Sequence, residues 1–177
     1  MARMAIYTAQ AAAAAQSATL ATIPEGAAGV RDTLDQMIAW VRQYKINPEI
    51  RATAEQIISP VPAKDAAGEV DAIFQWVRDE IRYTSDVRDV ETLKSPDALL
   101  AQRFGDCDDM SLLVATLLES IGKATRFVAA GYSAPGVFEH VYAQVRLGES
   151  WVSLEVTEPV ALGYEQPGIV AKMIRHV

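Results

Sequence analysis

The single cysteine of this 177-residue chain lies within residues 105–109, directly before the strongest helical pattern in the sequence. Cys107 extends the apolar stripe of that pattern into the first turn of the predicted helix, where unpaired backbone N–H groups and the helix dipole favour a thiolate. A thiolate is the form of cysteine that attacks carbonyl carbons. We therefore interpret Cys107 as a candidate nucleophile. The stripe recurs at helical spacing, and Gly122 ends it: Met110, Leu113, Val114, Leu117, Leu118 and Ile121.

Three aspartates surround this cysteine. Asp106 is a good N-cap for the predicted helix, and Gly105 lets the backbone turn tightly into the cap. The negative charges of Asp106, Asp108 and Asp109 should raise the pKa of Cys107, so a nucleophile at neutral pH needs a cationic partner, usually histidine. A calcium loop is an alternative role for the aspartates, but the spacing lacks the glycine and glutamate of an EF-hand. One cysteine and one well-placed histidine also argue against zinc, and we expect no metal.

Of the two histidines, the first lies in a region with the alternation of β-strands. Apolar and polar side chains alternate over residues 140–147 and again over residues 151–156. Gly148-Glu149 between these runs predicts a β-hairpin with a two-residue loop. His140 begins the first predicted strand, whereas His176 is close to the end of the chain and is expected to be exposed.

The two-residue loop also sets the register of this hairpin. It pairs Leu147 with Ser150 and, by counting back, places Tyr142 opposite Glu155. The apolar faces of the two strands then coincide, which supports this register. His140 and Glu155 become diagonal neighbours on one face, with Cα atoms roughly 7–8 Å apart. The sequence therefore predicts that a carboxylate orients the imidazole.

Three blocks of the chain, in this order, resemble the transglutaminase-like superfamily: FGDCDDMSLLVATLLESIGKATRFVAAGY, EHVYAQV and SWVSLEVT. The resemblance covers about residues 48 to 165 and is most like the small transglutaminase-like cysteine proteases of bacteria and phage. It implies a papain-like α+β fold, in which N-terminal helices precede an antiparallel sheet. It also implies a Cys-His-Asp triad, which carries over onto Cys107, His140 and Glu155. Glu155 departs from the family's aspartate by one methylene, although some triads do use glutamate.

Two aromatic residues are further candidates for the cleft. Tyr83 ends the third predicted helix, and in the resembling family an aromatic residue upstream of the nucleophile often lines the site. Tyr83 is therefore a candidate donor to the oxyanion, with a packed aromatic as the simpler alternative. Trp151 lies on the polar face of its predicted strand. We interpret it as a candidate wall of the cleft, with a place in the core as the alternative.

The remaining patterns place helices before strands. Amphipathic helices are predicted over residues 30–41, after Asn47-Pro48 and over residues 70–81, and a short helix starts at Ser95-Pro96. This order is typical of an α+β domain rather than of a β-α-β repeat.

The N-terminus is rich in alanine. The run at residues 11–15 indicates either a helix or a weak secretory signal, and we favour the first because the leucine-rich centre of a signal is missing. Gly26 and Gly29 mark a break before the next helix. We therefore divide the chain into an alanine-rich segment, residues 1–29, and a single transglutaminase-like domain, residues 30–177.

Composition narrows the functional classes. With 50% hydrophobic and 22% charged residues, the chain is long enough for one well-buried domain, and no apolar run approaches a membrane span. The net charge of -7 and the pI near 4.8 argue against nucleic acid as a partner. A lone cysteine is compatible with a reducing compartment. We expect a cytoplasmic bacterial protein without a cofactor, with association with phage and the oligomeric state left open.

These observations favour acyl transfer by a thiol on a protein or peptide amide. His140 takes the proton of Cys107, Glu155 stabilises the imidazolium, and the thiolate attacks the amide carbonyl to give a thioester. The N–H of Cys107 is a candidate oxyanion donor, a contact worth roughly 3 kcal/mol of barrier. Water as acceptor gives a cysteine peptidase or amidase, which the resemblance favours, and an amine gives a transglutaminase. The alternatives are a cross-linking or cyclising enzyme and a catalytically silent binding or phage-assembly protein.

Overall fold

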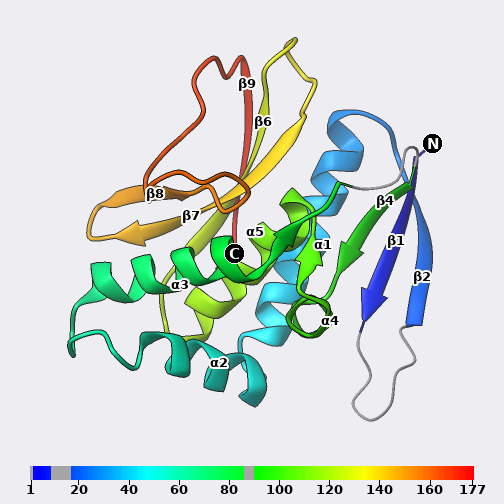
Figure 1. Ribbon diagram of the computed structural model, residues 1–177. Helices are drawn as coiled ribbons and strands as arrows, with labels where there is room; N and C mark the ends of the chain where they lie inside the picture. Colours follow the sequence, from blue (N-terminus) through cyan, green and yellow to red (C-terminus); the bar gives the residue numbers. More distant parts are fainter. Residues whose placement is uncertain (1, 9–16, 86–89) are drawn as a thin grey trace.

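The computed structural model describes residues 2–8, 17–85 and 90–177. Over these ranges it has the predicted α+β architecture, with helices that contact a four-stranded and a three-stranded sheet (Figure 1). The helices are α1 (Ala27–Tyr44), α2 (Pro48–Ile58), α3 (Ala66–Glu80), α4 (Pro96–Gln102) and α5 (Cys107–Ser120). The strands are β1 (Ala2–Thr8), β2 (Ser17–Ile23), β3 (Arg82–Tyr83), β4 (Val90–Lys94), β5 (Phe104–Gly105), β6 (Thr125–Gly131), β7 (His140–Leu147), β8 (Ser150–Leu154) and β9 (Ala171–His176).

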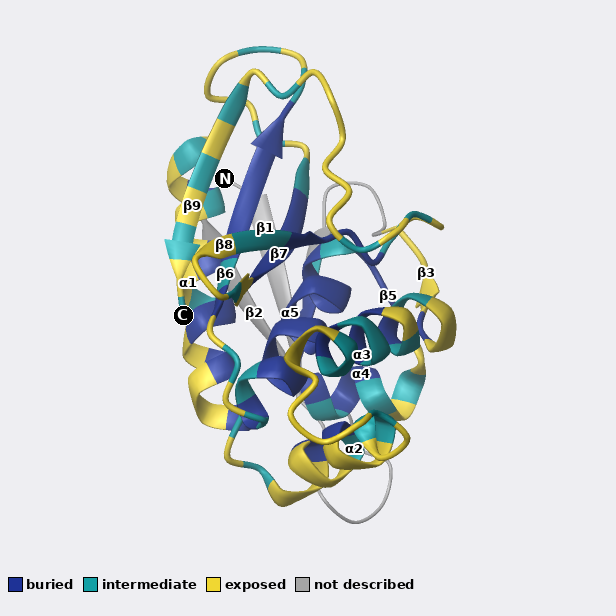
Figure 2. Ribbon diagram, turned by 90° about the vertical axis from the view of Figure 1, so that its left-hand side faces the viewer, coloured by how far each residue is buried: buried dark blue, intermediate teal, exposed yellow. Residues whose placement is uncertain are grey.

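Helix α5 is the centre of the molecule. Twelve of its 14 residues are buried, and it packs against the other four helices of the described chain and against β7 (Figure 2). A helix that is apolar on nearly all sides must lie inside the core. Its C-terminal end is closed as the sequence predicts, because the N–H groups of Gly122 and Lys123 donate to the carbonyls of Glu119 and Leu118. Cys107 is therefore the first residue of an enclosed helix.

The four-stranded antiparallel sheet, in the order β8-β7-β6-β9, carries the predicted hairpin. Leu147 pairs with Ser150 and Ala143 with Leu154, so the register inferred from the loop is confirmed. The apolar side chains of β7 pack against α5. The opposite face is less exposed than its polar character suggests, because Tyr142 and Gln144 are both buried. Residues of the segment that follows β8 contact this face.

The N-terminal strands were not predicted. Strand β1 pairs with β2 in antiparallel and with β4 in parallel orientation. The helix predicted at residues 11–15 lies outside the described residues, and residues 17–23 after it form β2. Helix α1 begins directly after Gly26, whose φ of 67° favours glycine, so the predicted boundary between residues 29 and 30 falls inside α1.

Helices α2 and α4 begin where the sequence predicts, whereas α3 begins at Ala66, before the predicted range, and also ends earlier than predicted. The side chain of Asn47 caps α2, and Pro96 occupies the first turn of α4 after Ser95. The predicted third helix ends at Glu80, because the backbone of Ile81 is already extended. Tyr83 therefore lies in β3, which pairs in parallel with β5. Among the described residues, no helix is long and apolar enough to cross a membrane.

Candidate active site

The start of α5 fixes the position of Cys107. The carboxylate of Asp106 accepts hydrogen bonds from the N–H groups of Asp108 and Asp109, both at 3.1 Å, and Asp109 completes a capping box by accepting from the N–H of Asp106. The predicted N-cap is confirmed. Position 105 needs a glycine for a steric reason, since a Cβ there would come within 2.7 Å of the Cβ of Asp109.

The carboxylate of Asp109 is paired with Lys94. It accepts hydrogen bonds from the backbone N–H and the Nζ of Lys94, each at 2.7 Å, and is fully buried. Burial raises the pKa of Asp109, and the contacts with Lys94 oppose this effect. The pair thus connects the end of β4 to the first turn of α5. Sequence reasoning missed Lys94 because it is distant in the chain and carries no motif.

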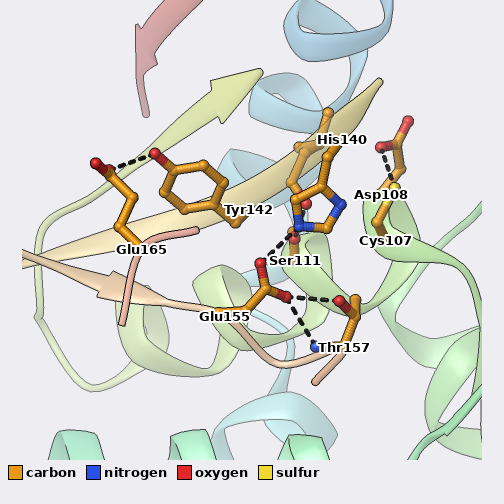
Figure 3. Close-up of polar contacts among 9 residues, drawn as sticks. Cys107, Asp108, Ser111, His140, Tyr142, Glu155, Thr157 and Glu165 are labelled. Atoms are coloured by element: carbon orange, nitrogen blue, oxygen red, sulfur yellow. Dashed lines mark hydrogen bonds and ion pairs between the residues drawn. The ribbon is translucent and has the colours of Figure 1, made fainter. Parts of the chain in front are cut away.

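His140 and Glu155 are in direct contact. His140 Nε2 lies 2.6 Å from Glu155 Oε2, as the diagonal placement in the hairpin predicts (Figure 3). The other oxygen, Oε1, accepts from the backbone N–H of Thr157 at 3.1 Å and from its hydroxyl at 2.6 Å. Burial alone would raise the pKa of Glu155, but the contacts with His140 and Thr157 outweigh it and hold the pKa below its ordinary value. Thr157 is a functional candidate that the sequence analysis did not identify.

Cys107 lies on the other side of the imidazole. The backbone N–H of Val141, the residue after His140, interacts with the sulfur of Cys107 and lowers its pKa. One turn along α5, the hydroxyl of Ser111 donates to the carbonyl of Val141 at 3.1 Å. These contacts hold the start of β7 against the start of α5. Figure 3 shows Nε2 of the ring on the side of Glu155 and Nδ1 on the side of Cys107.

The surroundings of Cys107 favour the protonated thiol. Burial is the main cause that raises its pKa well above the ordinary value, followed by the charges of Asp108 and Asp106. The thiol also donates to Asp108 Oδ1 at 3.4 Å. The predicted effect of the aspartates is thus confirmed for two of the three. The expected stabilisation of a thiolate by the helix start is outweighed, so Cys107 needs a base to become a nucleophile.

The two aromatic candidates have different positions. Tyr83 pairs with Gly105, two residues before Cys107, and is 49% exposed, so the alternative of a packed core aromatic is wrong. Trp151 pairs with Arg146, six residues along β7 from His140, which is roughly 20 Å.

The ring of Trp151 contacts the guanidinium of Arg126 at 4.3 Å and the exposed ring of His176 at 5.2 Å. The prediction that Trp151 walls the cleft is therefore wrong, since alternation gives the face of a strand but not the position along it. The expected exposure of His176 is confirmed. Over the described ranges, no group of three or more His, Cys, Asp or Glu side chains is placed to hold a metal ion.

Comparison with known proteins gives fold relatives of low sequence identity. No curated protein matches the chain. A proposed protease from Parabacteroides distasonis has a TM-score of 0.59 at 12% identity, over 78% of this chain and 28% of that one. A proposed cysteine protease from Cytophaga hutchinsonii has a TM-score of 0.52 at 17% identity, over 81% of this chain and 49% of that one. This chain thus spans less than half the length of both.

A third similar structure, calcium-bound LapG from Legionella pneumophila, has a TM-score of 0.51 at 14% identity, over 77% of this chain and 80% of LapG. These likenesses support the fold. The sequence model of the transglutaminase-like superfamily matches residues 51–156, which include the helix of Cys107 and the hairpin of His140 and Glu155. This match covers more than half of the chain, which therefore belongs to the transglutaminase-like superfamily.

Proposed function

We propose that this protein is a cysteine-dependent acyl transferase that hydrolyses amide bonds in proteins or peptides, with Cys107, His140 and Glu155 as a triad. The superfamily generally comprises cysteine-dependent enzymes. The observation that carries the proposal is the arrangement around the imidazole, with Glu155 2.6 Å from Nε2 and Cys107 on the Nδ1 side (Figure 3). A carboxylate at Nε2 favours the tautomer whose Nδ1 lone pair accepts the thiol proton.

The proposed reaction has two steps. Nδ1 of His140 takes the proton of Cys107, and the sulfur attacks the amide carbonyl while the imidazolium gives its proton to the leaving amine. This forms a thioester and releases the amine. Nδ1 then takes a proton from water, the hydroxide attacks the thioester, and the thiol leaves with that proton, which releases the carboxylic acid. Glu155 stays ionised and stabilises the imidazolium in both steps.

The oxyanion needs donors close to the sulfur. The side chain of Asp106 caps the N–H groups of Asp108 and Asp109 rather than that of Cys107. The N–H of Cys107, at the positive end of α5, is therefore our proposed oxyanion donor. Tyr83 is the proposed second contributor, because β3 holds it beside Gly105. Substitution of Tyr83 by Phe and by Leu separates the contribution of its hydroxyl from that of its ring.

A peptide library with wild-type protein and the Cys107→Ser variant tests the proposal. The serine keeps the start of the helix but is a much weaker nucleophile beside the same histidine. We expect new peptide termini, mapped by mass spectrometry, with the wild type only. A fluorescent primary amine in a parallel reaction tests for transamidation. Cleavage that persists in Cys107→Ser contradicts the thiol mechanism, and incorporation of the amine without cleavage changes the acceptor from water to an amine.

A catalytically silent binding protein is the second candidate. The hydrogen bond from the thiol to Asp108 favours it, because it stabilises the unreactive form of Cys107. Under this alternative, the wild type neither cleaves peptides nor incorporates the amine, and Cys107→Ser leaves binding of a partner unchanged.

A further inference from the structure

The ring of His140 has an aromatic neighbour in addition to Glu155. Tyr142 lies two residues along β7 on the same face of the sheet, and the two rings are stacked, with centroids 6.1 Å apart and planes inclined by 21°. Tyr142 is 2% exposed and packs with Val128 and Ala130 of β6. Its ring is therefore held in place by the sheet, beside an imidazole that is only partly buried.

The hydroxyl of Tyr142 is fixed by a carboxylate. It donates to Glu165 Oε1 at 2.5 Å (Figure 3). The other oxygen of Glu165 accepts from Lys172 Nζ at 2.7 Å. Burial and the contact with Glu165 raise the pKa of Tyr142 far above its ordinary value, so its hydroxyl stays a donor. Burial alone would raise the pKa of Glu165, but the contacts with Lys172 and Tyr142 outweigh it, and Glu165 stays an acceptor.

Glu155 and Glu165 come from one connection, residues 155–170 between β8 and β9, which we call the β8–β9 loop. The loop is tied to the sheet and to α3. The N–H of Gly163 donates to the Ser153 carbonyl at 2.9 Å, and Arg78 donates to the Val160 carbonyl at 2.9 Å. One loop thus supplies a carboxylate to His140 and a second carboxylate to the neighbouring ring of Tyr142.

We propose that Tyr142 and Glu165 are positioning residues for His140, an inference that rests on the proposed function. A single hydrogen bond to Glu155 fixes Nε2 but lets the ring pivot about that contact. The stacked ring of Tyr142, anchored through its hydroxyl to Glu165, restricts the pivot and keeps Nδ1 directed at Cys107. Misplacement of a reacting group by about 1 Å costs up to roughly a hundredfold in rate, so loss of the anchor has a measurable effect.

The test uses the full chain and the variants Tyr142→Phe and Glu165→Gln. Tyr142→Phe keeps the stacked ring and removes only the hydroxyl, whereas Glu165→Gln keeps the shape of the acceptor and removes its charge. Tyr44→Phe is the matched control, because Tyr44 is also buried and its hydroxyl also bonds a side chain, that of Ser95. Urea unfolding of all three variants separates loss of stability from loss of positioning.

Two readouts are measured, the rate of Cys107 alkylation by iodoacetamide at neutral pH and the side-chain ¹⁵N NMR spectrum of His140. We expect alkylation about tenfold slower in Tyr142→Phe and in Glu165→Gln. We expect one dominant tautomer, protonated at Nε2, in the wild type and in Tyr44→Phe, and mixed tautomers in the other two variants. Wild-type spectra and rates in Tyr142→Phe and Glu165→Gln overturn the inference.

The NMR readout does not depend on catalysis. If substitution of His140 by Ala leaves alkylation unchanged, the proposed function fails. Tautomer mixing in Tyr142→Phe in that case still demonstrates that Tyr142 positions the ring. Conversely, if His140→Ala slows alkylation while Tyr142→Phe changes neither readout, the proposed function stands and the positioning role is refuted.

Discussion

Replacement of Glu155 by Gln removes one charge from the proposed triad and, because of Thr157, also reverses a hydrogen bond. The N–H and the hydroxyl of Thr157 both donate to Oε1, so the amide oxygen of a glutamine takes that position. The amide NH₂ then occupies the place of Oε2 and faces Nε2 of His140. A donor at Nε2 favours the tautomer with its proton on Nδ1, which cannot accept a proton from Cys107.

The size of the effect follows from the contact between His140 and Glu155. With Nε2 and Oε2 2.6 Å apart, the centres of the two charges lie about 4 Å apart. At an effective dielectric constant of ~20, their attraction is about 4 kcal/mol, which corresponds to roughly a thousandfold in rate. The unfavourable tautomer adds to this loss, and we expect turnover to fall by about 10³- to 10⁴-fold.

The assay is turnover of a peptide found in the library screen, with urea unfolding as a check that the fold is retained. Glu155→Asp is the companion variant. It keeps the charge but withdraws the carboxylate by one methylene from both His140 and Thr157, so we expect an intermediate loss. Near-wild-type turnover in Glu155→Gln refutes this role of the carboxylate and leaves a dyad of Cys107 and His140.

Three further predictions concern the charges around the site. Asp108→Asn removes a charge that raises the pKa of Cys107, so the pH profile of alkylation should move to lower pH; an unmoved profile contradicts this role. Asp109→Ala leaves the buried ammonium of Lys94 without its partner. The free energy of unfolding, measured with urea, should fall by about 3–5 kcal/mol, and a fall of less than about 1 kcal/mol contradicts the importance of the pair. The folded state lowers the pKa of Glu165, so its contribution to stability is present above the unfolded value of 4.5 and is lost as the pH falls below it. Glu165→Gln should therefore weaken the loss of stability at acid pH, measured as the free energy of unfolding in urea at pH values around 4.5. The same acid loss in the wild type and in Glu165→Gln contradicts this contribution of Glu165.

The site was predictable where local rules set the geometry. The N-cap at Asp106 fixes where α5 begins, and the loop at Gly148 fixes the hairpin register, so Cys107 and the contact between His140 and Glu155 follow from short-range patterns. A one-residue slip would move every side chain to the other face, which makes the register well determined.

The remaining features depend on tertiary contacts. Strands β1 and β2 form in an alanine-rich region because pairing with each other and with β4 outweighs helix propensity. Lys94 reaches Asp109 only through the folded chain, and Trp151 is separated from the site by the length of β7. Thr157 and Glu165 lie on the β8–β9 loop, whose path follows no periodic pattern.

Alkylation of Cys107 over a range of pH, in wild type and in His140→Ala, tests the central claim most directly. Because Cys107 is the only cysteine, intact mass reports on this one thiol. If His140 takes its proton, the wild type should react at neutral pH, and the profile of His140→Ala should move to higher pH, where burial, Asp108 and Asp106 set the pKa of the thiol. Superimposable profiles would contradict the pairing of Cys107 with His140 and with it the proposed mechanism.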